Sequence, residues 1–348
     1  MQNRSIKPGH VWLDTNGNRI HAHGGSIMYV DGTFYWYGEN KEKSKADSGI
    51  WHWGVRCYAS KDLYNWEDQG LIIPPNEEDP ASPLHPSQCL DRPHIIYHRA
   101  TGQYVCWVKI MGKDGTQAST VLVADALLGP YTIVRTGLRP LGMNAGDFDL
   151  VVAPADGKAY YYFERVHSEL ICADLTGDYT NVTGYYSTHF PHPHPPYVRE
   201  GPAYFFYKGL HYLFTSGTTW YYPNASEVAN ARTYHGPWTV LGNPHPDDPT
   251  ATSFHSQISS VFKHPHKKEL YIALADRWLP NLPHDAPNMM DQFAQYFGGD
   301  SGCAAPEASL IPAYPDTSIA DYVWLPVRFD GQMAYMDWQD EWRIEDYD

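Results

Sequence analysis

The chain of 348 residues carries a formal net charge of −15, with 40 acidic against 25 basic residues. This excess of negative charge argues against nucleic acid and against anionic membrane surfaces as partners. Hydrophobic residues make up 43% of the chain, enough for a substantial core, and they are weighted toward 27 Tyr, 12 Trp and 12 Phe. Such an aromatic-rich composition favours β structure, and flat aromatic rings also suit the binding of carbohydrates.

The five cysteines are odd in number, widely spaced and without a CxxC pair. We therefore expect neither a disulfide framework nor a zinc–thiolate site, and most of the cysteines are expected to be core thiols. No apolar run reaches the length of a membrane span, and the polar stretch Met1–Ser5 shows no signal peptide. The compartment is left open between a cytoplasmic protein and a secreted one whose signal has been removed.

Taken in chain order, five pairs of short aromatic and β-branched segments are each joined by a tight turn. Each pair predicts a β-hairpin, because four of the five turns contain the glycine that such turns favour. A tyrosine of the second segment recurs at intervals of 69, 56, 52 and 59 residues. The pairs cover residues 23–38, 92–108, 148–163, 200–216 and 258–275, and the recurring tyrosines are Tyr35, Tyr104, Tyr160, Tyr212 and Tyr271.

Behind several hairpins a third segment runs into a polar tail, as at residues 57–66, and a fourth segment such as 70–73 comes next. Four antiparallel strands recurring five times predict an all-β fold, a single five-bladed β-propeller with four-stranded antiparallel blades. The alternative is a β-sandwich with coincidental hairpins, and the even spacing of the turns favours the propeller. One domain would then span residues 1–348, with the last blade closing near residues 322–327 and 333–337.

Residues 279–315 break the repeat. They are rich in Pro, Met, Asp and Gly, and the segment is long for an unstructured loop. We therefore expect an irregular insertion in or near the last blade, with a short helix around residues 289–296.

The start of the first strand of each hairpin carries a polar residue in all five repeats. In a propeller the innermost strand of each blade lines the central channel, so these side chains are expected to converge on one opening. Crowding raises the pKa of the least solvated carboxyl group, and two carboxyl groups across a sugar ring are the usual requirement for glycosidic cleavage. The five residues are His23, Asp91, Asp147, Glu200 and Gln257, and Glu39, after the second strand of the first blade, is expected to face the same opening.

Two further residues are candidates for contact with a substrate. Trp220 comes after the second strand of the Glu200 hairpin, and it either stacks on a sugar ring or packs between blades. Arg92, beside Asp91, either binds a sugar hydroxyl group or holds the carboxylates apart, and we favour the second role.

No required cofactor is expected from the sequence. The His- and Pro-rich tract at residues 189–196 suggests a metal site, but its alternating prolines favour an extended loop that keeps the imidazoles apart. His23 or His255 could approach a calcium ion at the channel centre. Calcium prefers oxygen ligands, however, and no oxygen-rich loop of the EF-hand type is visible. A central calcium ion is therefore left open without support, and no metal ligand is assigned.

Several short motifs of the sequence resemble those of glycoside hydrolase family 43, most of all those of its exo-β-1,3-galactanase branch. The resemblance runs from about residue 10 to the C-terminus. The motifs are HAHGG at 21–25, YGENK at 37–41, DRPHIIY at 91–97, GDF at 146–148, REGPA at 199–203, TSG at 215–217, SQ at 256–257 and YVWLP at 322–326.

The resemblance implies a five-bladed propeller that hydrolyses glycosidic bonds with inversion. It implies Glu200 as the general acid and Asp147 as the carboxylate that tunes the pKa of Glu200 and orients it. Most of the family has an aspartate base near the start of the first blade, where this chain has His23. In the galactanase branch a glutamine has been proposed to handle the water, and Gln257 matches that glutamine.

A neutral amide is a very poor proton acceptor. Gln257 is expected either to activate the water through an imidic-acid tautomer, or only to position the water while Glu39 or Asp91 takes the proton. The resemblance also departs at two positions, because Asp91 stands where the branch usually has Glu and Gly146 where an Arg is common. The expected substrate-binding residues are Glu39, Asp91, Arg92, His23, Tyr37 and Trp220.

The leading expectation is an exo-acting enzyme that releases galactose from β-1,3-galactan, such as the backbone of arabinogalactan. One alternative is a family 43 enzyme of another specificity, acting on arabinofuranosides, xylosides or galactofuranosides. A second alternative, from a different class, is a non-catalytic sugar-binding propeller, since the usual base is absent.

Overall fold

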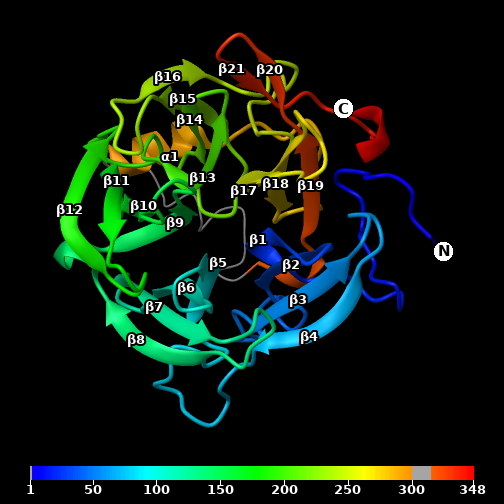
Figure 1. Ribbon diagram of the computed structural model, residues 1–348. Helices are drawn as coiled ribbons and strands as arrows, with labels where there is room; N and C mark the ends of the chain where they lie inside the picture. The colour runs from blue at the N-terminus through cyan, green and yellow to red at the C-terminus, as the bar shows by residue number, and fades with distance from the viewer. Residues whose placement is uncertain (1, 300–314) are drawn as a thin grey trace.

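Five antiparallel sheets surround a common axis in the computed structural model, which describes residues 2–299 and 315–348 (Figure 1). The predicted five-bladed β-propeller is confirmed, and the first strand of each blade lies innermost. Blade 1 contains β1 (His23–Val30), β2 (Thr33–Glu39), β3 (Val55–Ser60) and β4 (Glu67–Ile73). Blade 2 contains β5 (Cys89–His98), β6 (Gln103–Met111), β7 (Gln117–Ala124) and β8 (Thr132–Leu138). Blade 3 contains β9 (Ala145–Val152), β10 (Ala159–Arg165), β11 (Glu169–Leu175) and β12 (Val182–His189).

The last two blades differ in their number of strands. Blade 4 contains β13 (Glu200–Tyr207), β14 (Leu210–Ser216), β15 (Glu227–Ala231) and β16 (Thr239–Gly242). Blade 5 contains only β17 (Gln257–Lys263), β18 (Tyr271–Arg277) and β19 (Asp321–Pro326) among the described residues.

The segment at residues 333–337, expected to close the last blade, lies elsewhere. β21 (Met333–Tyr335) pairs with β20 (Arg328–Asp330) in a separate hairpin. This hairpin packs on blade 4, where the ring of Phe329 stacks on Tyr207 at 3.5 Å and Tyr212 donates a hydrogen bond to the carbonyl oxygen of Gln332 at 2.9 Å. The β20–β21 hairpin thus buries its aromatic side chain against blade 4 and does not add a fourth strand to blade 5.

The two ends of the chain meet beside the last blade (Figure 1). The amide of Ile6 donates to the carbonyl oxygen of Trp342 at 2.9 Å, and the amide of Trp342 donates to the carbonyl oxygen of Ile6 at 3.0 Å. Because a propeller is closed by contact between its first and last blades, this pairing ties the ring together.

Most of the aromatic residues serve the packing between blades. Trp36 of blade 1 lies edge-on to Trp324 and Tyr322 of blade 5, with ring centres 4.6 Å apart in both pairs. Trp66 joins the same cluster at 5.3 Å from Trp36. Edge-to-face arrangements at these distances are the favoured geometry of aromatic pairs. The aromatic excess of the composition therefore mainly reflects the propeller core.

The cysteines of the described residues are free thiols, as predicted. Cys57, Cys106 and Cys172 are buried in the blades and Cys89 is partly buried, while Cys303 lies outside the described residues.

A β-bulge interrupts the mouth of every blade. The register with the second strand shifts between His23 and Ser26, Asp91 and His94, Glu200 and Ala203, and Ile258 and Ser260, and in blade 3 it shifts opposite residues 145–148. A bulge bends its strand, increases the local twist and re-aims a side chain. The repeated bulge therefore turns the first residues of the inner strands toward the channel opening.

Gly25 lies in the first of these bulges and has no room for a side chain. A Cβ atom there would lie 1.8 Å from the carbonyl oxygen of Tyr37 on the paired strand. We expect Gly25→Ala to lower the free energy of unfolding by about 3 kcal/mol, because the backbone of β2 would have to move. Urea denaturation measures the effect.

The matched control is Gly177→Ala, at a position with open space and without a positive φ. It is expected to change stability by less than about 0.5 kcal/mol. Equal effects of the two substitutions would contradict the close approach at Gly25.

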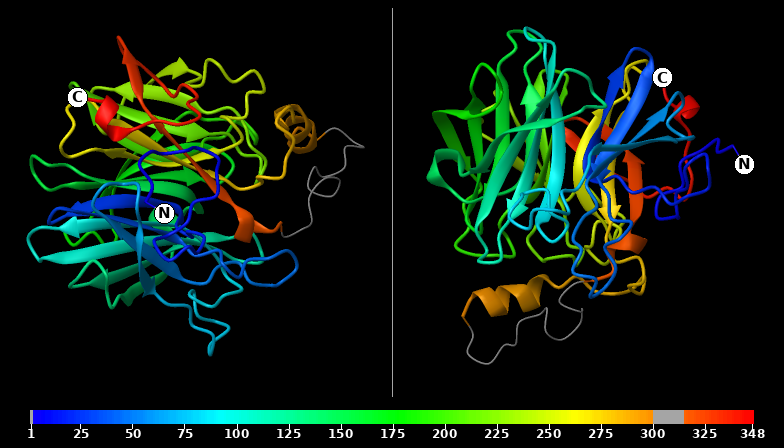
Figure 2. Two further views of the ribbon diagram at one scale, coloured as in Figure 1. Left: turned by 90° about the vertical axis from the view of Figure 1, so that its right-hand side faces the viewer. Right: turned by 90° about the horizontal axis from the view of Figure 1, so that it is seen from below.

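The insertion predicted at residues 279–315 lies between β18 and β19, and residues 300–314 of it are outside the described residues. The short helix is confirmed as α1 (Met290–Phe297), which stands off one face of the propeller (Figure 2). Over the described residues, no helix combines the length and apolar character needed to cross a membrane.

Candidate active site

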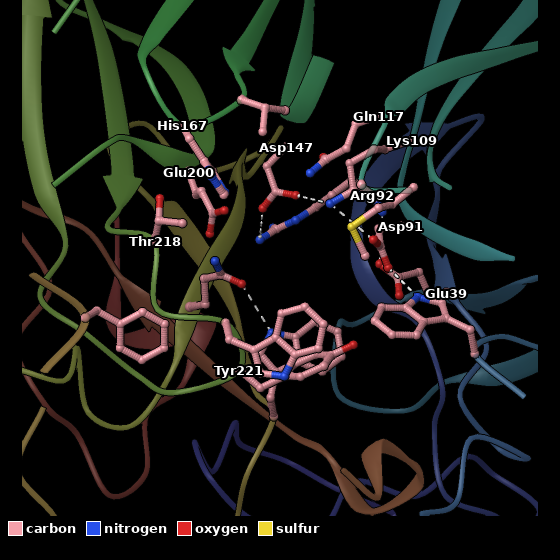
Figure 3. Close-up of a pocket in the computed structure, with 18 of the residues that line it drawn as sticks. Glu39, Asp91, Arg92, Lys109, Gln117, Asp147, His167, Glu200, Thr218 and Tyr221 are labelled. Carbon is pink, nitrogen blue, oxygen red and sulfur yellow. Dashed lines mark hydrogen bonds and ion pairs between the residues drawn. The ribbon is translucent and has the colours of Figure 1, made fainter. Parts of the chain in front are cut away.

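A cavity of about 270 Å³ opens at the mouths of the inner strands (Figure 3), and residues of α1 form part of its wall. The bulges of the five blades bring together side chains that are far apart in the sequence. Seven of the nine residues expected at the site line this cavity: Glu39, Asp91, Arg92, Asp147, Glu200, Trp220 and Gln257.

His23 and Tyr37 do not line the cavity, which corrects the expectation that they contact a sugar. His23 is fully buried, with its Nδ1 2.9 Å from Oδ1 of Asp276 and its ring stacked on Tyr322 at 4.6 Å. The hydroxyl of Tyr37 accepts a hydrogen bond from the amide of Ile95 at 2.9 Å. Both side chains join blade 1 to a neighbouring blade, because their polar atoms make hydrogen bonds within the protein and do not face the cavity.

Asp147 is an ionised carboxylate between two cations. Its Oδ2 lies 2.9 Å from the guanidinium of Arg92, and its Oδ1 lies 2.9 Å from Nζ of Lys109. Burial alone would raise the pKa of Asp147, but the charges of Arg92 and Lys109 hold it well below its usual range. Figure 3 shows both contacts as dashed lines.

The surroundings of Glu200 shift its pKa in the opposite direction. Burial raises the pKa of Glu200 well above its usual range, and the negative charges of Glu164 and Asp147 raise it further. Lys109 and Arg92 lower the pKa by a smaller amount. The surroundings thus push the pKa values of two carboxyl groups in one cavity in opposite directions, up for Glu200 and down for Asp147, which suits a proton donor beside an ionised carboxylate.

Arg92 adopts a strained backbone to make its contacts. Its φ is +53°, in a bulge where the corresponding residues of blades 1 and 4 are Gly24 and Gly201. A side chain in this left-handed region costs free energy, and such strain persists where the surroundings demand it. The guanidinium also donates to the carbonyl oxygen of Ile258 at 3.0 Å. Arg92 thus ties blades 2, 3 and 5 together.

Two more carboxyl groups line the same cavity. Oε2 of Glu39 lies 2.9 Å from Nζ of Lys41, and its Oε1 accepts the amide hydrogen of Arg92 at 2.9 Å. Burial raises the pKa of Glu39 to about 7, although Lys41 opposes the shift. Oδ1 of Asp91 accepts a hydrogen bond from the indole of Trp51 at 2.7 Å.

The amide of Gln257 is held in a defined orientation. The indole of Trp278 donates to Oε1 at 3.3 Å, and Nε2 donates to the hydroxyl of Ser216 at 3.0 Å. An indole N–H can only donate, so the oxygen of the amide must face Trp278. One lone pair of Oε1 and one N–H of Nε2 are then left for a water or a substrate.

Residues 19–279 match the glycosyl hydrolases of family 43. The chain belongs to this family. Among solved structures, a family 43 β-1,3-galactosidase is 28% identical with a TM-score of 0.81, over 99% of this chain and 65% of that chain. A second family 43 β-1,3-galactosidase, solved with galactodeoxynojirimycin, is 27% identical with a TM-score of 0.78, over 97% of this chain and 100% of that chain.

An exo-β-1,3-galactanase from Clostridium thermocellum is 26% identical with a TM-score of 0.74, over 97% of this chain and 66% of that chain. The chain therefore spans about two thirds of the length of two of these three structures. Among curated proteins, no sequence matches this chain.

Two residues of the site in this family 43 glycoside hydrolase were not found from the sequence. The first is Glu164 of β10, which is 1% exposed and whose Oε1 accepts the amide hydrogen of His167 at 2.8 Å. Burial raises its pKa to about 7. A Cβ atom at Gly146 would lie 2.2 Å from its Oε2, so the glycine noted as a departure from the resemblance is what makes room for Glu164.

The second is Lys109, which lies directly opposite Asp91 in the pairing of β5 with β6. In the sequence it is a single lysine at the end of an apolar strand, and such a residue usually points to solvent. A signal was nevertheless present. An inner-strand aspartate with a lysine at the paired hairpin position predicts a cross-strand ion pair.

Part of the cavity wall is apolar. Phe293 and Phe297 of α1 line it together with Met111 and Val166. Trp220 lies between this wall and Trp51, with the two indole ring centres 6.3 Å apart. A cavity with carboxylates on one wall and aromatic rings on another suits a ligand with hydroxyl groups on its edge and C–H groups on its faces.

In the described ranges, no group of three or more His, Cys, Asp or Glu side chains is arranged to hold a metal ion. The histidines of the tract 189–196 have separate neighbours. The ring of His192 lies 6.2 Å from that of Tyr197, whereas Nε2 of His189 lies 2.8 Å from the hydroxyl of Ser187. The tract thus presents its imidazoles to different parts of the surface.

Proposed function

We propose that the protein is an inverting, exo-acting glycoside hydrolase that releases galactose from β-1,3-galactan. The observation that carries the proposal is the geometry of the cavity, which Glu200 and Asp147 both line and in which Asp147 lies 2.9 Å from both Arg92 and Lys109. Burial and the neighbouring carboxylates raise the pKa of Glu200, whereas Arg92 and Lys109 hold the pKa of Asp147 low. An acid that stays protonated at neutral pH is what the departing glycosidic oxygen requires.

In this mechanism Glu200 donates its proton to the leaving oxygen as the glycosidic bond breaks. Asp147 keeps the proton on Glu200 until then through its negative charge, and it orients the acid. A water attacks the anomeric carbon from the opposite face of the ring, held by the free lone pair and N–H of Gln257. Inversion results because the water enters opposite the leaving group.

The proton of the attacking water passes to a carboxylate, Glu39 or Asp91, rather than to the amide of Gln257. Both carboxylates line the cavity, and the pKa of Glu39, raised to about 7 by burial, matches the requirement for a base near neutral pH. The carboxylate thus accepts the proton of the water, and Gln257 binds the water in position.

The names of the similar structures support galactose as the released sugar, since they are β-1,3-galactosidases and an exo-β-1,3-galactanase. Another specificity within family 43 is the second candidate, favoured by Asp91, whose side chain is one carbon shorter than the glutamate common at that position. Sugar binding without catalysis would not require a carboxyl group whose pKa is raised as that of Glu200 is.

The substrate is tested with β-1,3-galactobiose, β-1,4-galactobiose and a set of aryl pentosides. We expect galactose release from the β-1,3-linked disaccharide at least about tenfold faster than from the β-1,4-linked one, the discrimination that a few differing contacts supply. Proton NMR during the first minutes should show α-galactose as the first product, because a β-linkage is cleaved with inversion. Turnover of a pentoside without turnover of any galactoside would refute the substrate, and β-galactose as first product would refute inversion.

A further inference from the structure

Lys109 makes two contacts inside the cavity and has the capacity for a third. Its Nζ lies 2.9 Å from Oδ1 of Asp147 and 3.1 Å from Oδ2 of Asp91 (Figure 3). An ammonium group carries three N–H donors. No third partner of Nζ is found among residues 2–299 and 315–348, and the side chain, 12% exposed, is part of the cavity wall. The third N–H is therefore open to whatever occupies the cavity.

Asp91, which lies beside Lys109, offers a hydrogen-bond acceptor next to this donor. The two oxygens of Asp91 accept from Trp51 and Lys109, and each carboxylate oxygen has a second lone pair. A donor and an acceptor thus lie 3.1 Å apart on one wall of the cavity. Two adjacent hydroxyl groups of a sugar match such a pair, because one can accept from the ammonium while the other donates to the carboxylate.

The ammonium is held rigidly in its charged form. Burial alone would lower the pKa of Lys109, but the charges of Asp147 and Asp91 keep it well above its usual range. Its position is set by two carboxylates from different blades, so little freedom is lost when a ligand binds. A fixed, charged donor is stronger and more directional than a neutral one.

We propose that Lys109 is a specificity-determining residue, which donates a hydrogen bond to one hydroxyl group of the bound sugar while Asp91 accepts from its neighbour. The proposal rests on the proposed function only in taking a hexose as the ligand. A purely structural Lys109 would hold the two carboxylates together and make no contact with the sugar. The two roles differ in whether removal of one sugar hydroxyl has the same effect with and without the lysine.

The experiment measures the dissociation constants of galactose and of its 2-, 3-, 4- and 6-deoxy derivatives by titration calorimetry, for the wild type and for Lys109→Met. In the wild type we expect the two derivatives that each lack one of two adjacent hydroxyl groups to bind about 10- to 100-fold more weakly than galactose, because each loses a hydrogen bond to a charged group. In Lys109→Met one of these two derivatives should bind within about threefold of galactose, since its donor is already absent, while the other keeps its penalty. Lys158→Met, on an exposed turn remote from the cavity, is the control and should keep the wild-type pattern.

Lys109→Met leaves Asp91 and Asp147 without their shared cation and could impair folding. The same comparison is therefore also made in the Asp91→Asn background, with and without Lys109→Met, where one repelling charge is gone. Penalties for both derivatives that are unchanged by Lys109→Met, with all ligands weakened equally, would overturn the proposal in favour of the structural role. Absence of galactose binding to the wild type would instead refute the proposed substrate.

Discussion

Replacement of Glu200 by glutamine is expected to lower kcat on β-1,3-galactobiose by about 10²- to 10⁴-fold, the usual contribution of a general acid. The amide has no proton to give to the leaving oxygen, although it keeps the shape and the cavity contacts of the carboxyl group. Binding of galactose, measured by calorimetry, should change by less than about tenfold, because the chemical step alone needs the proton. A sugar-binding protein without activity would show no turnover to lose.

The leaving group provides an internal check on this result. An aryl galactoside with an acidic phenol needs little protonation as it departs, so Glu200→Gln should slow its cleavage far less than that of the disaccharide. Glu67→Gln, an exposed glutamate on β4, is the matched control and should leave both rates unchanged. Equal losses on the two substrates would contradict the role of Glu200 as the acid.

Replacement of Asp147 by asparagine is expected to lower kcat by about 10²-fold and to move the basic limb of the pH–rate profile to lower pH. The negative charge of Asp147 raises the pKa of Glu200, while Arg92 and Lys109 lower it. Removing the carboxylate takes away the first influence and leaves the two cations uncompensated. Glu200 would then lose its proton at a lower pH, and activity would fall earlier as the pH rises.

The same substitution has a consequence for stability. Two buried cations would each lose a partner at 2.9 Å, and breaking a buried ion pair from one side typically costs about 3–5 kcal/mol. Urea denaturation of Asp147→Asn should show this loss, whereas Asp125→Asn, at an exposed position after β7, should not. A basic limb that stays in place or moves to higher pH would refute the electrostatic role of Asp147.

The positions of the site residues in the sequence could be predicted from local rules. Each hairpin has its own turn and its own alternation of residues, so the strand starts at Asp91, Asp147 and Glu200 could be located without knowledge of the neighbouring blades. A propeller then required those starts to meet at one opening. The same reasoning assigned His23 to the opening, and there it was wrong because Asp276 of another blade binds the imidazole inside the core.

The partners of the site residues could not be inferred in this way. Lys109 lies in the second strand of blade 2, and its contact with Asp147 of blade 3 depends on the angle between two blades. Glu164 reaches its place only because Gly146 has no side chain. Both residues stand in the second strand opposite a strand start, but this position carries a different side chain in each blade, as with Glu39, Ser216 and Asp276. The repeat therefore did not indicate which partners they have.

By itself the sequence determined the repeat, the hairpins and the row of polar residues at the strand mouths, because turn chemistry and hydrophobic alternation act over a few neighbouring residues. Only the tertiary structure decided which of these side chains carry a proton. The pKa of Glu200 depends on burial and on charges supplied by blades 2 and 3, and those distances exist only once the ring of blades has closed.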